Sequence, residues 1–186
     1  TAQQQIEAIL TDSGIPIGWD LDFNLDDWLI PGNTWAMQST YMPAINDIVN
    51  AAGGYVQPHN VDQTLRILKR YPTLPWTWTD LFVPDITLPS APVVREGIEW
   101  VTRPSYNRVF VMGQTNGVLG QVTRAGTDGS IVAPSIVHPV ITEDIPARGR
   151  GEAELAFTGK MAMVTLRLPV LPETGIIVPG QMVRFE

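Results

Sequence analysis

Apolar side chains recur at the three-to-four-residue spacing of an amphipathic helix in two parts of the chain. This pattern predicts helices over residues 2–11 and from about residue 40 to residue 52. A third helix is predicted over residues 142–158, because Thr142 can cap it and two acidic residues follow at the positive end of its dipole. Gly149 and Gly151 lie inside the third of these segments. Each glycine lowers the helix propensity by about 1 kcal/mol relative to alanine, which counts against a helix in this segment.

Strict alternation of apolar and polar residues predicts a half-buried strand over residues 20–25. Two further short strands, over residues 55–57 and 64–68, flank a polar loop. Together with the helix that separates them from the first strand, they predict a compact strand–helix–hairpin unit over residues 15–70. Later strands are predicted over residues 97–101, 108–112, 118–124, 161–168 and 180–185, and the second of these is apolar on both faces, as in a buried strand.

Glycine and proline mark the breaks between these elements. Ser13-Gly14 predicts the end of the first helix, and Asn116-Gly117 predicts a hairpin turn. Five prolines within residues 71–92 predict an extended, semi-rigid linker. We therefore expect an α+β fold with two domains. The first is a strand–helix–hairpin (βαββ) domain over residues 1–92, and the second is a small β-barrel-like domain with one helix over residues 93–186.

Charge and composition narrow the choice of function. The 186 residues include 12 Lys and Arg against 19 Asp and Glu, a net charge of −7, which argues against a nucleic-acid partner. Eight acidic residues and no basic residue precede Arg66, a polarity that indicates either a solvated face or a surface for a basic partner. There is no cysteine, which excludes disulfides, thiolate catalysis and Cys-based metal centres.

The chain shows no signal for a membrane. No apolar run approaches the roughly 18 residues that a membrane-spanning helix needs. The N-terminus has neither the cationic region nor the apolar core of a secretory signal. Because the chain begins with Thr1, we expect it to be a fragment or a processed product of a longer protein.

The residues most suggestive of chemistry form no recognisable site. Residues 20–27 are rich in carboxylates, but Leu25 and Pro31 stand where an EF-hand calcium loop needs Gly and Glu. His59 and His138 are too far apart in sequence for a zinc-binding helix, and no G-x-S-x-G motif accompanies them. We therefore expect no metal, no cofactor and no catalytic residue, and we interpret His59 as a solvated loop residue.

Two alternative functions stay open. Trp76 and Trp78 would place both indoles on one side of an extended segment, where they could stack against sugar rings as in a carbohydrate-binding β-module. The plainer interpretation is a Pro-rich arm that two aromatic side chains fix to the core. Asp26 and Asp27 could form the general acid–base pair of a hydrolase, although no spacing argument supports that pair.

The order of motifs from about Trp35 onward resembles the later part of tailed-phage hub proteins, a family that includes the Mu-like tail hub and late control protein D. The resemblance lies in two groups of segments. The first group is residues 51–58 (AAGGYVQP), 65–72 (LRILKRYP), 106–113 (YNRVFVMG) and 139–142 (PVIT), followed by an Arg/Ala/Glu-rich helix. The second group is residues 164–169 (VTLRLP) and 179–184 (PGQMVR).

This resemblance implies a structural role and transfers no catalytic residue. Hubs of the family form trimers under the tail tube, where two barrel-like domains per subunit create a pseudo-sixfold ring that meets the hexameric tube. The opposite side of the ring holds the spike. The chain would then be a non-enzymatic component of the virion tail, assembled in the host cytoplasm with other tail proteins as partners. It departs from the family pattern in lacking the first barrel.

Overall fold

A computed structural model describes residues 1–12, 18–79, 82–114, 117, 119–172 and 175–186 of the chain. The chain divides into two compact units, each made of two separate segments. Unit 1 comprises Thr1–Leu74 and Tyr106–Phe157, and unit 2 comprises Pro75–Ser105 and Thr158–Glu186. The observed division therefore differs from the expected boundary between residues 92 and 93, because the chain leaves unit 1, returns to it and leaves it again.

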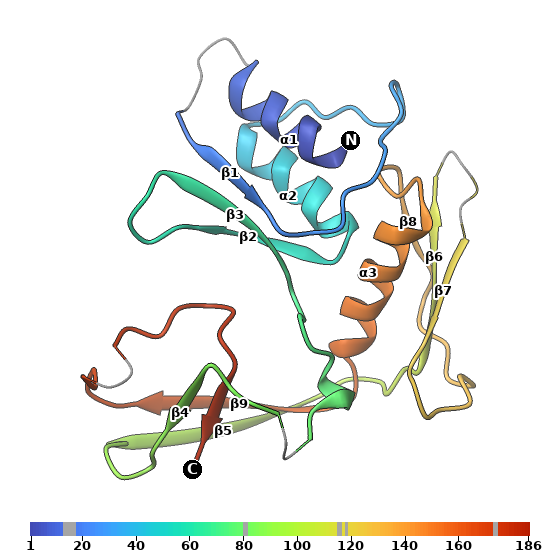
Figure 1. Ribbon diagram of the computed structural model, residues 1–186. Helices are drawn as coiled ribbons and strands as arrows, with labels where there is room; N and C mark the ends of the chain where they lie inside the picture. The colour runs from blue at the N-terminus through green and yellow to red at the C-terminus, as the bar shows by residue number, and fades with distance from the viewer. Residues whose placement is uncertain (13–17, 80–81, 115–116, 118, 173–174) are drawn as a thin grey trace. The chain divides into compact units, whose positions relative to one another are not determined.

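The first part of unit 1 has the predicted strand–helix–hairpin order. Its elements are α1 (Ala2–Thr11), β1 (Asp20–Phe23), α2 (Tyr41–Ala51), β2 (Gly54–Pro58) and β3 (Thr64–Lys69). β3 is the central strand of this sheet, parallel to β1 and antiparallel to β2. Both α1 and α2 lie against the sheet in Figure 1, and their apolar stripes are buried. The predicted end of the first helix at Ser13-Gly14 lies outside the described residues.

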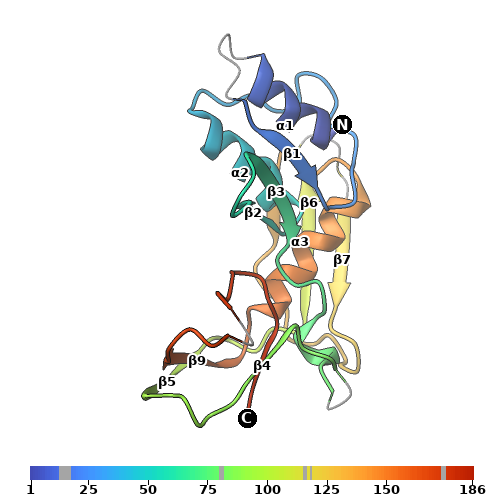
Figure 2. The same cartoon turned by 60° about the vertical axis from the view of Figure 1, so that its left-hand side comes forward.

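A second sheet with its own helix completes unit 1. The strands are β6 (Arg108–Gly113), β7 (Leu119–Thr123) and β8 (Ile136–His138), and the helix is α3 (Asp144–Ala156). β6 is central, antiparallel to β7 and parallel to β8. Figure 2 shows β6 and β7 side by side, and α3 packs against both of these strands. The hairpin turn predicted at Asn116 falls on a residue outside the described part.

Two glycines that weaken the helix prediction for residues 142–158 explain how α3 packs. A Cβ atom on Gly149 would lie 2.6 Å from the backbone oxygen of Ala52, at the end of α2. A Cβ atom on Gly151 would lie 2.5 Å from the Cγ2 atom of Val122 in β7. The glycines therefore lower the local helix propensity. Because they have no side chain, they allow the backbone of α3 to pack directly against the end of α2 and against β7.

The buried strand predicted at residues 108–112 is covered on one face only. Val109 and Val111 are fully buried, whereas Phe110 and Met112 on the other face are partly exposed. Trp28 is 2% exposed in the core of unit 1, and its indole Nε1 donates to the backbone oxygen of Val140 at 2.9 Å. This bond joins two stretches of chain that are more than a hundred residues apart in sequence.

Unit 2 is built from two separate pairs of strands. β5 (Arg95–Thr102) and β9 (Lys160–Arg167) form an antiparallel ribbon, which is visible as two long arrows in Figure 1. β4 (Ile86–Leu88) and β10 (Val183–Phe185) form a short parallel pair. The mixed α+β class is thus confirmed. The described strands form no closed barrel, however, and the one helix of the second half belongs to unit 1.

No helix among the described residues is both long enough and apolar enough to cross a lipid bilayer.

Candidate functional site

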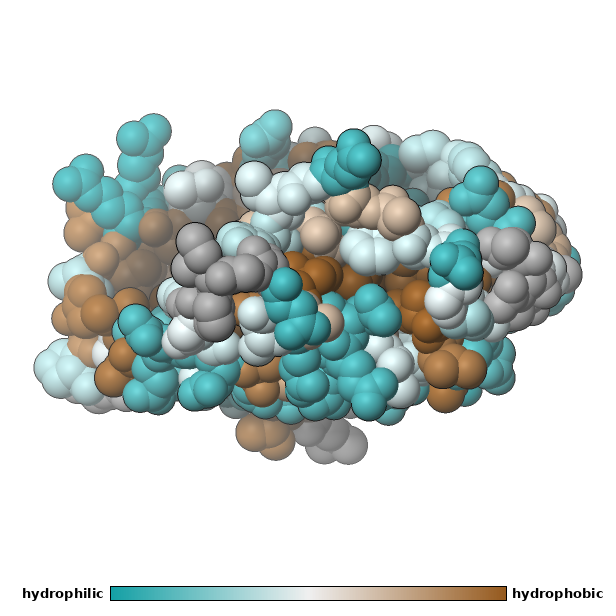
Figure 3. Space-filling view, turned by 90° about the horizontal axis from the view of Figure 1, so that it is seen from above, coloured by the Kyte–Doolittle hydropathy of each residue, from teal (hydrophilic) through white to brown (hydrophobic). Residues whose placement is uncertain are grey.

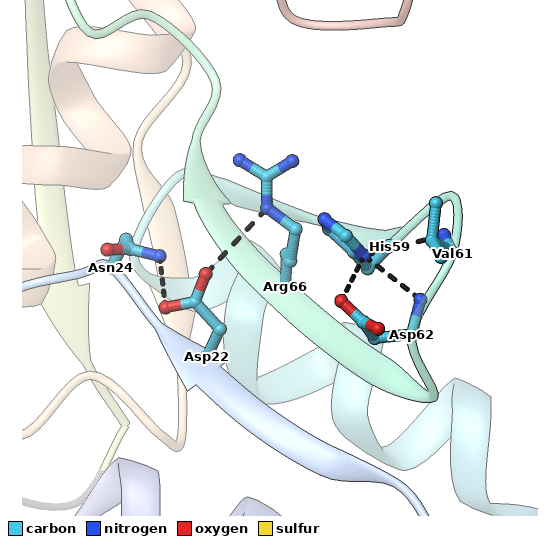
Figure 4. A network of polar contacts seen from close by, with 6 residues as sticks. All are labelled: Asp22, Asn24, His59, Val61, Asp62 and Arg66. Atoms are coloured by element: carbon cyan, nitrogen blue, oxygen red, sulfur yellow. Dashed lines mark hydrogen bonds and ion pairs between the residues drawn. The ribbon is translucent and has the colours of Figure 1, made fainter.

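The Asp22 carboxylate of β1 makes polar contacts with neighbouring residues of the sheet. Asp22 accepts a hydrogen bond from the side-chain amide of Asn24 at 2.8 Å, and its Oδ2 atom lies 3.7 Å from the guanidinium Nε of Arg66 on β3. Figure 4 shows this contact. Within the described parts of the chain, no three His, Cys, Asp or Glu side chains are grouped so that they could hold a metal ion.

His59 closes the loop between β2 and β3. Its Nδ1 atom lies 3.1 Å from the Oδ2 atom of Asp62 and 3.1 Å from the backbone nitrogen of the same residue, as Figure 4 shows. Both contacts are made within three residues of sequence, in an exposed turn. This geometry stabilises the turn, as an Asx-type contact does, and fits the interpretation of His59 as a loop residue.

The proposed acid–base pair has structural contacts instead. The Lys69 ammonium group donates to Asp26 Oδ2 at 2.8 Å and holds the pKa of the Asp26 carboxyl below its usual value. Asp27 accepts hydrogen bonds from the backbone nitrogens of Gln3 and Trp28. A general acid at neutral pH needs a raised pKa, so a carboxylate with a lowered pKa does not suit that role.

A half-open pocket of about 490 Å³ lies within unit 1. Most of its charged side chains are neutralised by neighbours in the pocket: Lys69 by Asp26 at 2.8 Å, and Arg148 by Glu152 at 3.0 Å. Its remaining cation, Arg70, donates to neutral oxygens of Asn50 and Gly54. The lining residues are Leu25, Asp26, Ala52, Gly53, Lys69, Arg70, Tyr71, Leu74, Ile145, Pro146, Arg148, Gly149, Glu152 and Ala153.

The structure reveals one polar cluster that the sequence does not indicate. Trp35 Nε1 donates to Asp47 Oδ2 at 2.7 Å, and Asp47 Oδ1 lies 3.2 Å from His138 Nε2. His138 Nδ1 accepts the backbone N–H of Val140, so the ring proton is on Nε2 and is donated to Asp47. Because Asp47 and His138 are 91 residues apart in sequence, no motif could join them. The cluster links α2 to β8 and has a structural role.

The tryptophan pair does not have the expected extended geometry. Pro75–Thr77 forms a 3₁₀ turn, in which the backbone nitrogen of Trp78 donates to the Pro75 oxygen at 3.3 Å. The turn replaces the extended backbone on which alternate side chains such as those of Trp76 and Trp78 would share one side. Proline fits the first position of such a turn because its φ angle is already suitable. The extended backbone on which the carbohydrate-binding alternative depended is therefore not present at Pro75–Thr77.

Several exposed apolar side chains of the described residues lie together on the β5–β9 ribbon. On the face drawn in Figure 3, hydrophobic residues show between hydrophilic ones, as on ordinary protein surfaces. The ribbon differs, because Ile98 is 54% exposed and Trp100 60% exposed beside the exposed Val164. At this exposure Trp100 is not part of the buried core of the described chain. Contiguous apolar surface of this kind marks interaction sites.

Comparisons with known proteins give a fold likeness only. No protein-family model and no curated protein matches the chain. A tail protein from Neisseria meningitidis MC58 aligns with 100% of the chain at 15% identity and a TM-score of 0.49, over 55% of its own length. The 43 kDa tail protein of prophage MuSo2 from Shewanella oneidensis aligns with 93% of the chain at 18% identity and a TM-score of 0.47, over 49% of its length. The chain thus spans about half the length of these solved tail proteins.

Proposed function

We propose that the chain is a structural, non-enzymatic component of a phage or prophage tail and forms part of the baseplate hub between the tail tube and the spike. It would act in the virion tail after assembly in the bacterial cytoplasm, with tube, spike or baseplate proteins as partners and as a homotrimer in the full-length protein. The proposal rests on the chain's own residues, because the two solved tail proteins have TM-scores below 0.5.

The proposal is supported mainly by the order of the segments that resemble the hub family and by the contacts that some of them make with one another. Residues 51–58 and 65–72 contain the paired strands β2 and β3. A Cβ atom on Gly53, in the first of these segments, would lie 2.8 Å from the Cβ atom of Ala153 in the Arg/Ala/Glu-rich helix. Gly113, at the end of β6, allows the backbone oxygen of Ile141 to approach in the same way. Several of the segments that resemble the hub family therefore meet one another in unit 1.

The chemistry of the described residues also supports a structural role. The carboxylates and histidines singled out in the sequence make contacts that stabilise turns, helix ends and strand pairs. The exposed apolar surface of the β5–β9 ribbon is suited to contact with another protein. A hub requires rigid domains and contact surfaces and needs no reaction centre.

Particles induced from a lysogen that carries the full-length gene would test the proposal. We expect an antibody against this chain to label the end of the tail tube in electron micrographs. Deletion of the gene should give heads without complete tails, and a plasmid copy should restore them. Normal tails in the deletion strain, together with absence of the protein from purified particles, would refute the proposed function.

A further inference from the structure

One wall of the pocket of unit 1 is fixed by the packing of two helices. The end of α2 and the helix α3 meet there at Gly53 and Gly149, both of which line the pocket. A Cβ atom on Gly149 would lie 2.6 Å from the backbone oxygen of Ala52, so the two helices touch through backbone atoms. Residues at the end of β3 and after β1 form further walls. The volume of about 490 Å³ lies within the range of about 300–1,000 Å³ that is usual for ligand pockets.

Three cations and two carboxylates line this pocket, which leaves one positive charge in excess. Lys69 and Arg148 are neutralised by carboxylates at 2.8 Å and 3.0 Å, whereas Arg70 is not. The hydrogen bonds of Arg70 to neutral oxygens of Asn50 and Gly54, at 3.1 Å and 3.4 Å, both use its Nη2 atom. Among the described residues, the Nε and Nη1 atoms of Arg70 have no hydrogen-bond partner. Arg70 is therefore the cation of the pocket that is available to an added anion.

The charge of the lining selects the kind of anion. One excess positive charge matches the single negative charge of a carboxylate. A phosphate group carries about −1.5 to −2 charges at pH 7, and Asp26 and Glu152, which line the same pocket, would repel the additional charge. The C-terminal end of α2 carries only a partial negative charge, which weakens the attraction to Arg70 without cancelling it. Hydrogen bonds between a guanidinium and a carboxylate are about twice as strong as those between neutral groups, so a carboxylate suits this position.

Apolar side chains lie beside the charged ones. Leu25, Leu74 and Ile145 line the pocket, and Ile145 is 44% exposed. They offer a surface for an aliphatic group next to the carboxylate. The pocket is half-open, so it covers one part of a ligand and leaves the rest in solvent. A side chain that projects from a larger molecule fits this shape better than a free small molecule, of which a pocket usually encloses about 70–90% of the surface.

We propose that this pocket binds an acidic residue of another protein, together with an aliphatic residue next to it in the same segment. Arg70 binds the carboxylate through its Nε and Nη1 atoms, and Leu25 and Ile145 contact the aliphatic side chain. Asp26 and Glu152 disfavour a second acidic group, which makes the pocket selective for a single carboxylate. This inference goes beyond the proposed function and does not depend on it, because it rests on the lining of one pocket.

Fluorescence anisotropy of a labelled peptide tests the inference with the full-length protein. The probe is a fluorescein-labelled peptide of sequence Gly-Ser-Leu-Glu-Leu-Ser-Gly, and its control has glutamine in place of glutamate. We expect a saturable rise in anisotropy with the glutamate peptide. The glutamine peptide should bind about tenfold more weakly, because it loses one charged hydrogen bond to the protein.

Arg70→Gln removes the cation from the pocket, and Arg66→Gln is the matched control. Arg66 lies four residues earlier in the chain, on β3, and pairs with Asp22 at 3.7 Å outside the pocket. Arg70→Gln should lower the affinity for the glutamate peptide about tenfold and leave the affinity for the glutamine peptide unchanged. Arg66→Gln should change neither affinity. Because both partners are varied, the cycle isolates the contact between guanidinium and carboxylate from any general effect of the substitution, and circular dichroism confirms that each variant is folded.

Four results overturn the inference. The first is the absence of saturable binding of the glutamate peptide to the full-length protein. The second is an equal loss of affinity for both peptides in Arg70→Gln, because the carboxylate would then not be bound by Arg70. The third is tighter binding of a peptide with phosphoserine in place of glutamate, which would assign the pocket to phosphate. The fourth is displacement of the peptide by an equal concentration of N-acetylglutamate amide, since the small acid alone would then be the ligand.

Discussion

The close approach of α2 and α3 can be tested by a glycine substitution with a matched control. Gly53 follows the C-terminal turn of α2 with a φ angle of +72°. A Cβ atom there would lie 2.8 Å from the Cβ atom of Ala153 and closer still to the backbone oxygen of Gly149. Gly126 has nearly the same φ angle, +77°, but a Cβ atom on it would meet no atom within 4 Å. The pair therefore separates backbone strain from steric overlap.

We expect Gly53→Ala to destabilise the protein more than Gly126→Ala. Both variants place alanine in the left-handed region, which costs about 1–2 kcal/mol. Both also lose entropy in the unfolded chain, which offsets about 0.4–1 kcal/mol of that cost. Only Gly53→Ala adds overpacking against a backbone oxygen, which cannot move aside as a flexible side chain can. Overpacking of this kind costs about 1–3 kcal/mol, and that is the expected difference between the two variants.

Urea unfolding followed by tryptophan fluorescence measures this difference, because Trp28 is buried in the same unit as Gly53. The slope of the transition should stay unchanged in both variants, so that the midpoints report stability. Equal midpoints for Gly53→Ala and Gly126→Ala would refute the close packing of α3 on the end of α2.

Three further predictions concern single side chains. Trp28→Phe should lower the free energy of unfolding by about 1–3 kcal/mol, measured by circular dichroism in urea, because the buried oxygen of Val140 loses its donor. Lys69→Met should cost less than about 1 kcal/mol at pH 7, since the ion pair is exposed. Because the folded-state pKa of Asp26 lies below its unfolded value, the pair stabilises above about pH 4, and the cost should disappear as the pH falls further. A cost that grows toward low pH would contradict that sign. Glycans should cause no change in the tryptophan fluorescence of the unchanged protein or of Trp78→Ala. A saturable shift in the unchanged protein that Trp78→Ala abolishes would revive the carbohydrate-binding alternative.

Local patterns were sufficient to predict most elements of unit 1. The alternation at residues 20–25 and the apolar stripe of the helix that follows are properties of a few neighbouring residues, and they lead directly to β1 and α2. The hairpin of β2 and β3 is also a local structure, because its strands are joined by a short polar loop. In these segments the local pattern and the tertiary fold agree, which is what makes them predictable.

Contacts between distant residues could not be predicted in the same way. The bond between Trp28 and Val140 and the cluster of Trp35, Asp47 and His138 depend on the path of the chain between the two sheets, which no local pattern encodes. The division into two units also depends on pairing between distant segments. The prolines of residues 71–92 predict a linker, but part of that segment, β4, pairs with β10 near the end of the given sequence. Proline content reports local stiffness and cannot report pairing across about a hundred residues.

The two units differ in what they require from other molecules, and this difference argues for an interface role of unit 2. Unit 1 buries Trp28, Ile45 and Val111 against its own helices and sheets, so its apolar core is covered within the unit. Unit 2 exposes Ile98 and Trp100 on a ribbon with two open edges. A sequence that maintained such a surface in a monomer would risk aggregation, since long unprotected edges invite pairing. The exposed ribbon is therefore the part of the described chain that is best suited to contact with another molecule.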